Sequence, residues 1–142
     1  MMRDKQYILD TNTLIEFAIG STEVTTKVLN TGFAKCCMSV VSLHELYFGA
    51  LLARQKSERY YLQEIGRINK LLKCFDVLHL PVKAQDYAQV KLALRKKGKP
   101  VDEFDMVIAG QAIDAGLIVV TDNVKHFENM PGVKIENWVE RQ

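Results

Sequence analysis

The 142-residue chain has few cysteines, and their pattern excludes two common scaffolds of small proteins. Its three cysteines, Cys36, Cys37 and Cys74, are odd in number and form no C-x-x-C pair. This pattern gives neither a disulfide framework nor a zinc site. We expect small buried thiols in a reducing compartment instead.

The sequence also lacks long apolar runs and a strong charge of one sign. No stretch approaches the roughly 18 apolar residues that span a bilayer, and the run that starts at Tyr7 is too short for a signal sequence. We therefore expect a cytoplasmic protein with no membrane segment. Its 19 basic and 17 acidic residues give a net charge of +2, so any affinity for nucleic acid must come from local patches.

What is present is typical of a soluble globular protein. The content of 48% hydrophobic and 25% charged residues predicts one domain over residues 1–142, with a real core. Short apolar segments alternate with helical patterns, which favours an α/β fold with a mostly parallel sheet covered by helices on both faces. The expected strands are residues 7–9, 36–40, 75–80 (closed by Pro81), 117–120 and 133–135.

Local signals predict where the helices begin and which side chains they bury. Ser42 and Glu45 have the spacing of a capping box, which would make Ser42 the N-cap and put Glu45 in the first turn. Further helices are expected to open near Thr11 and to cover residues 23–33, 84–98 and 102–115. Another amphipathic helix is predicted from the apolar stripe of Tyr61, Ile65, Ile68 and Leu72.

Four acidic residues are distant in sequence but are expected at one rim of the sheet. Asp10 and Asp122 each follow a predicted strand, whereas Glu45 and Asp105 open predicted helices. In open parallel sheets, ligands bind beyond the carboxyl ends of the strands, and the helices that follow begin there too. Each acid alone can also be a capping or turn residue, because acids are favoured at helix N-termini.

Two features favour a functional cluster over four separate caps. Glu45 is spaced to share a helix face with Phe48, Gly49 and Leu52, and Asp105 with Ile108, Ala109 and Ala112; carboxylates on apolar faces are costly unless they are paired. No lysine or arginine lies in residues 8–15, 40–49, 104–112 or 119–123. Repelling carboxylates without a basic partner need an external cation, and oxygen ligands suit Mg²⁺ or Mn²⁺. Neutral oxygens are added by Asn12, Thr121 and Asn123.

Four motifs over essentially the whole chain resemble those of PIN-domain nucleases, and in particular VapC-type toxins of bacterial toxin–antitoxin pairs. In order, the motifs are residues 7–15 with Asp10, residues 42–49 with Glu45, residues 98–110 with Asp105, and residues 119–132 with Asp122 and Asn123. The closing Ile135-Glu136-Asn137-Trp138 is also typical of these toxins.

The resemblance implies a three-layer PIN-like fold and a Mg²⁺- or Mn²⁺-dependent endoribonuclease. It further implies a homodimer held inactive by a cognate antitoxin. By the same resemblance Asp10, Glu45 and Asp105 match the family's acidic triad. The fourth acid or ligand is Asp122 or Asn123, with Asp122 slightly favoured.

Two basic stretches are candidates for contact with RNA phosphates. One comprises Arg54, Lys56, Arg59, Arg67, Lys70 and Lys73. The other has Lys91 and, just before Asp105, the run Arg95, Lys96, Lys97 and Lys99, which is favoured by its position. Both are equally compatible with solvated helix faces.

Two alternatives remain open from the sequence. Asp10 followed by Thr11 and Asn12 loosely resembles haloacid-dehalogenase phosphatases, in which the aspartate is the nucleophile, but Asn12 cannot serve as their general acid. The other alternative is a catalytically inactive PIN-like domain that only binds RNA or a protein. The chemistry alone does not distinguish RNA from DNA, so RNA rests on the resemblance.

Overall fold

The computed structural model describes residues 4–80, 83–99 and 101–139, so Pro81 and Pro100 lie outside it. The strands are β1 (Tyr7–Leu9), β2 (Cys36–Ser39), β3 (Asp76–Leu78), β4 (Ile118–Val120) and β5 (Lys134–Glu136). The helices are α1 (Thr11–Ala18), α2 (Thr22–Thr31), the 3₁₀ helix η2 (Phe33–Lys35), α3 (Val40–Arg54), α4 (Glu58–Cys74), α5 (Ala84–Lys96), α6 (Glu103–Ala115) and α7 (Val124–Phe127).

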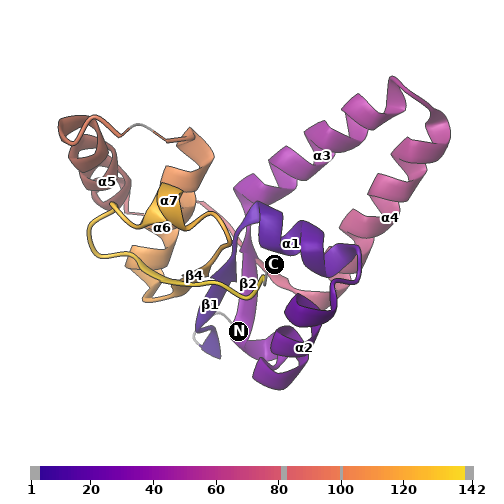
Figure 1. Cartoon of the computed structure of the whole chain (residues 1–142), viewed down its shortest axis with the longest axis horizontal. Coiled ribbons are helices and arrows are strands. Elements are labelled where there is room, and N and C mark those ends of the chain that lie inside the picture. Colours follow the sequence, from indigo (N-terminus) through magenta and orange to yellow (C-terminus); the bar gives the residue numbers. More distant parts are fainter. Residues whose placement is uncertain (1–3, 81–82, 100, 140–142) are drawn as a thin grey trace.

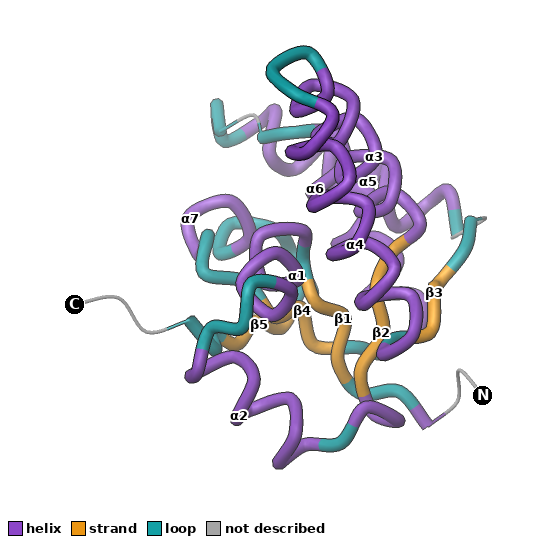
Figure 2. The backbone as a smooth tube through the Cα atoms, turned by 90° about the vertical axis from the view of Figure 1, so that its right-hand side faces the viewer, coloured by secondary structure: helices purple, strands orange, loops and turns teal. Residues whose placement is uncertain are grey.

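The strands form one parallel sheet in the order β3-β2-β1-β4-β5, which Figure 2 shows as a row of strands. Ile8 of β1 pairs with Cys37 on one side and with Val119 on the other. All the pairings are parallel, as continuously apolar strands predict. The α/β prediction is therefore confirmed.

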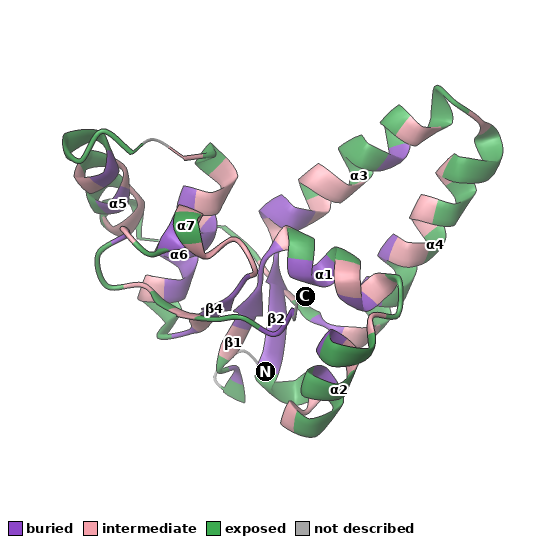
Figure 3. Ribbon diagram, viewed as in Figure 1, coloured by how far each residue is buried: buried purple, intermediate pink, exposed green. Residues whose placement is uncertain are grey.

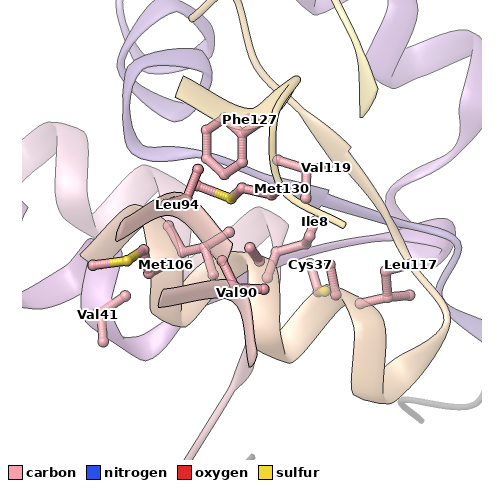
Figure 4. Packing of buried hydrophobic residues seen from close by; sticks show 13 residues of the cluster. Ile8, Cys37, Val41, Val90, Leu94, Met106, Leu117, Val119, Phe127 and Met130 are labelled. Atoms are coloured by element: carbon pink, nitrogen blue, oxygen red, sulfur yellow. The ribbon is translucent and has the colours of Figure 1, made fainter. Parts of the chain in front are cut away.

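Helices cover both faces of the sheet and create two cores (Figure 1). On one face, α5, α6 and α7 pack Leu94, Ile108 and Phe127 against Ile8 and Val119, as Figure 4 shows in part. On the other face, the buried side chains come from α1, α2 and α4; they include Leu14, Phe17, Val24, Val28 and Leu71. The central strands are buried because both their faces are covered.

The strand order places a switch point beside β1. From β1 the chain moves outward to β2 and β3, and then returns to the other side of β1 to form β4. Where the connections after two neighbouring strands run in opposite directions, a crevice forms at the carboxyl ends of those strands. Asp10 follows β1 and Thr121 follows β4, so the fold brings these two ends of strands together.

Helices α3 and α4 pack against each other and extend away from the sheet as a hairpin (Figure 1). Many residues along this hairpin are exposed, including large apolar ones such as Phe48 at 62% (Figure 3). The prediction that Glu45 shares a buried apolar face with Phe48, Gly49 and Leu52 is therefore wrong, because these three residues are exposed. The predicted face of Asp105 is confirmed, since Ile108, Ala109 and Ala112 are buried.

The predicted capping box is also wrong. Helix α3 begins at Val40, with Ser39 as its N-cap accepting from the backbone N–H of Val41. Ser42 is already inside the helix, and Glu45 lies in its second turn. Ser39 is held at this position by a second contact, because its hydroxyl donates to the side-chain oxygen of Gln111 of α6. The amide nitrogen of Gln111 donates in turn to the carbonyl of Leu78. This buried bridge ties the start of α3 to the ends of β2 and β3.

Helix ends elsewhere follow their sequence signals. Asp102 caps α6 by accepting from the N–H of Phe104, and Gly116 ends that helix in the left-handed conformation, with φ of 69°. In α4 the register of burial differs from the prediction: Ile68 and Leu71 are buried, whereas Leu72 is 40% exposed.

The corrected register of α4 predicts different costs for two neighbouring leucines. Leu71→Ala removes a side chain that is 1% exposed and packed in the core, so we expect the free energy of unfolding to fall by about 2–5 kcal/mol. Leu72→Ala is the matched control and should change it by less than about 1 kcal/mol. Chemical denaturation measures both, and equal losses would contradict the assigned register.

Candidate active site

A pocket of about 190 Å³ opens beyond the carboxyl ends of β1 and β4. It gathers side chains from segments that are far apart in sequence. Three of the predicted acids, Asp10, Glu45 and Asp105, lie in its wall together. Its lining among the described residues is Asp10, Thr11, Asn12, Glu45, Asp102, Asp105, Asn123 and His126.

Asp10 is fixed at the junction of β1 and α1. It is the N-cap of α1, and its Oδ1 accepts from the N–H of Thr13 at 2.9 Å. The side chain is buried, and burial raises its pKa above the ordinary range, although hydrogen bonds from Thr121 and Thr13 oppose the rise. The Thr13 hydroxyl in turn donates to the carbonyl of Val120, so α1 and β4 are joined directly behind the carboxylate.

Glu45 reaches the pocket from the second turn of α3. Thr11 Oγ1 donates to Glu45 Oε1 at 2.7 Å and also lies 2.9 Å from Ser42 Oγ. The two residues of the supposed capping box therefore serve tertiary contacts to α1. Burial raises the pKa of Glu45, the hydrogen bond from Thr11 lowers it, and the acids Asp102, Asp105 and Asp10 add to the rise.

Asp105 is positioned by the first turn of α6 and by a contact with His126 of α7. Its Oδ2 lies 2.7 Å from Nδ1 of His126, which is also 2.9 Å from Nδ2 of Asn123. Burial raises the pKa of Asp105, and the contact with His126 opposes the rise. His126 and Asp102 were not among the predicted site residues. The sequence offers only weak signals for them, since His126 is a single histidine in the last motif and Asp102 has the position of an ordinary helix cap.

The region after β4 favours Asn123 as the fourth ligand, whereas the sequence slightly favours Asp122. Asn123 lines the pocket, and Asp122 is not among its lining residues. Thr121 is fully buried; its hydroxyl accepts from the N–H of Asn123 and contributes to holding Asp10. Asn12, for which the sequence predicts an auxiliary oxygen, also lines the pocket.

The chemistry of the wall fits a divalent cation. Among the described residues, its lining contains four carboxylate side chains and neither lysine nor arginine, and oxygen ligands of this kind suit hard ions. Within the described parts of the chain, no three His, Cys, Asp or Glu side chains are close enough to hold an ion as they stand. The carboxylates are instead engaged by Thr13, Thr11 and His126.

Comparison with known proteins decides the family. The model of the PIN domain matches residues 7–133. The chain belongs to the PIN-domain family. It is 34% identical over 134 residues to the tRNA(fMet)-specific endonuclease VapC of Salmonella typhimurium, covering 94% of this chain and 98% of that protein. It is also 34% identical over 135 residues, with the same coverage, to ribonuclease VapC2 of Haemophilus influenzae.

Solved structures agree with the fold of this PIN domain. The chain superposes on a chain of DNA-bound VapBC from Salmonella typhimurium with a TM-score of 0.82 at 32% identity, covering 95% of this chain and 99% of that one. For VapBC-1 from nontypeable Haemophilus influenzae the TM-score is 0.76 at 26% identity, with 93% and 97% covered. The chain is thus a PIN-domain nuclease of the VapC type, which favours the nuclease over the phosphatase interpretation of Asp10.

Two further statements follow at the level of the family and the fold. PIN-domain nucleases generally depend on a divalent metal ion. Among the described residues, no helix combines the length and apolar character that crossing a membrane requires.

The raised pKa of Glu45 predicts how its removal affects stability. In the folded state the acid holds its proton more tightly than in the unfolded chain, so its contribution to stability is present at low pH and is lost as pH rises through the folded pKa. Glu45→Gln keeps an acceptor for Thr11 without the charge. With divalent ions chelated, we expect it to raise Tm by about 2–4 °C at pH 7 and to leave Tm unchanged at about pH 3.5.

Differential scanning fluorimetry in EDTA measures this effect. Glu128→Gln, at an exposed position outside the pocket, is the control and should give no such pH-dependent gain. A Tm for Glu45→Gln that is below wild type at pH 7 would show that the charge of Glu45 stabilises the metal-free fold.

Proposed function

We propose that residues 1–142 form one PIN domain that acts as a divalent-metal-dependent endoribonuclease, the toxin of a toxin–antitoxin pair. The observation that carries the proposal is the meeting of Asp10, Glu45 and Asp105 in one pocket whose described lining holds no lysine or arginine. The relatives named as VapC ribonucleases support RNA as the substrate. We also propose that the protein acts in the cytoplasm.

Asp10, Glu45 and Asp105 would hold the ion, with Asn123 or Asp122 as the fourth ligand. Mg²⁺ or Mn²⁺ bound there would neutralise the carboxylates, polarise the scissile phosphate and lower the pKa of a bound water. Thr121 and Thr13 orient the Asp10 carboxylate, and Asn12 adds a neutral oxygen at the edge. Because the pKa values of all three carboxylates are raised, a bound cation would stabilise their charged forms at neutral pH.

The protein's own side chains can position a water molecule for attack. Thr11 fixes one oxygen of Glu45, which leaves the other oxygen to accept a hydrogen bond from that water. His126 holds Asp105, and Asn123 in turn contacts His126. In-line attack on phosphorus breaks the P–O3′ bond and leaves a 5′-phosphate and a 3′-hydroxyl. This route uses no 2′-hydroxyl, so RNA preference must come from binding.

The acids are tested by neutral replacement of two ligands. Asp10→Asn and Asp105→Asn should each lower cleavage of single-stranded RNA in Mg²⁺ or Mn²⁺ by at least about 100-fold, because a ligand to the ion loses its charge. Asp114→Asn, on α6 but outside the pocket, is the matched control and should retain activity. Gel-resolved cleavage, with circular dichroism to check folding, gives the answer; wild-type rates in either folded variant would remove that residue from the site.

We also propose a cognate antitoxin as partner and a homodimer as the assembly. Structural neighbours of the chain are VapBC toxin–antitoxin complexes. The hairpin presents an apolar surface of the kind that marks protein interfaces, and we propose it for the antitoxin. This α3–α4 surface comprises Tyr47, Phe48, Leu51, Leu52, Tyr60 and Leu62.

Two equally exposed leucines test the α3–α4 surface. Leu51 on α3 and Leu92 on α5 are each 53% exposed. Leu51→Glu should weaken binding to the antitoxin encoded beside the toxin by at least about tenfold, because it places a charge in an apolar contact. Leu92→Glu should leave binding unchanged. Titration calorimetry with purified antitoxin measures both, and equal affinities for the two variants would place the interface elsewhere.

A further inference from the structure

A second pocket, of about 360 Å³, lies next to the acidic one, between α5 and α6. Its volume is within the roughly 300–1,000 Å³ of small-ligand pockets. The two pockets share the start of α6 as a common wall: Asp102 and Asp105 line the acidic pocket, and Glu103 and Met106 line the second. A chain bound across this wall would occupy both.

Apart from Glu103, the lining of this α5–α6 pocket is divided between apolar and cationic side chains. Leu94, Val101 and Met106 supply the apolar part, and Lys91 and Arg95 of α5 supply positive charge. A nucleotide has the same division, since its base has an apolar face and its phosphate is an anion. The acidic pocket alone would repel that phosphate, so the neighbouring cations provide the complementary charge.

Lys91 is already held in place by groups that a phosphate can replace. Its Nζ lies 2.8 Å from Glu103 Oε1, and the Tyr87 hydroxyl also donates to Glu103. Exposed ion pairs of this kind contribute little to stability. A phosphate oxygen can therefore take the place of Glu103 next to Lys91 without disturbing the fold, while Arg95 is exposed to solvent on the next turn of α5.

We propose that the α5–α6 pocket receives one unpaired nucleotide of the RNA, beside the scissile bond. The base packs on Leu94, Val101 and Met106, and its phosphate lies between Lys91 and Arg95. A base within a duplex is not free to enter, so the pocket makes the enzyme selective for loops and single strands. This inference rests on the proposed nuclease function and specifies its substrate.

Removal of a base tests the pocket directly. The probe is a 20-nucleotide single-stranded RNA whose cleavage position in Mn²⁺ has been mapped, and the same RNA with an abasic nucleotide at each flanking position in turn. With wild-type protein, one abasic position should raise KM by about tenfold, as expected for one lost base contact, with kcat little changed. In Val101→Trp, which fills the pocket, KM for the intact RNA should rise similarly and the abasic position should cost nothing further.

The cations are tested by a matched pair on α5. Arg95→Ala should weaken binding of the same RNA in EDTA and lower the slope of log K against log salt by about 1. Lys96→Ala removes the same charge from an exposed neighbour that does not line the pocket, and should change the slope less. Fluorescence polarisation across a salt series measures both, and it does not depend on Val101→Trp being folded.

The outcomes separate the pocket from the nuclease function. If wild-type protein cleaves the RNA but no flanking abasic position raises KM, or Arg95→Ala equals Lys96→Ala, the pocket is not a nucleotide site and the nuclease function stands. If wild-type protein with its metal does not cleave the RNA at all, the proposed function fails and the inference fails with it.

Discussion

The cost of removing three carboxylates from water at one pocket is the constraint on which this site depends; Asp10 is buried, and Glu45 and Asp105 are partly buried. Asp10, Glu45 and Asp105 come from three segments and share one small pocket, and no lysine or arginine is found in the part of its wall that the structure describes. Each would be costly alone, because burial favours the protonated acid. The fold tolerates them because every one accepts a hydrogen bond, from Thr13, Thr11 or His126. The site is thus held together by its neighbours before any cation contributes.

The sheet and the place of the acids could be predicted from the sequence because they depend on short-range patterns. Continuous apolar runs such as residues 7–9 and 118–120 are too short for a helix of their own and favour a strand buried on both faces. Once β1 and β4 are neighbours, Asp10 and the residues after Val120 must meet at one edge. Asp105 follows from its position in the first turn of α6, which Asp102 and Gly116 delimit in the sequence itself.

The errors arose where a tertiary contact outcompeted a local one. Ser42 and Glu45 have the spacing of a capping box, but both contact Thr11, 31 and 34 residues away, while Gln111 of α6 stabilises Ser39 as the cap. No local pattern contains those partners. Likewise, periodicity alone could not say whether Leu71 or Leu72 faces the core, because that depends on how α4 is rotated against α1 and α2.

The two sides of the first turn of α6 explain how an acidic site can attract a polyanion. Asp102 and Asp105 face the acidic pocket, whereas Glu103 faces Lys91 and leads to the basic end of α5. Glu103 weakens the cationic side only while no stronger anion is present, because its ion pair with Lys91 is solvent-exposed. An incoming phosphate would displace that carboxylate and set the scissile bond beside the acids. The cations of α5 and the acids of the active site would then lie on two sides of the first turn of α6, so that neither set of charges has to neutralise the other.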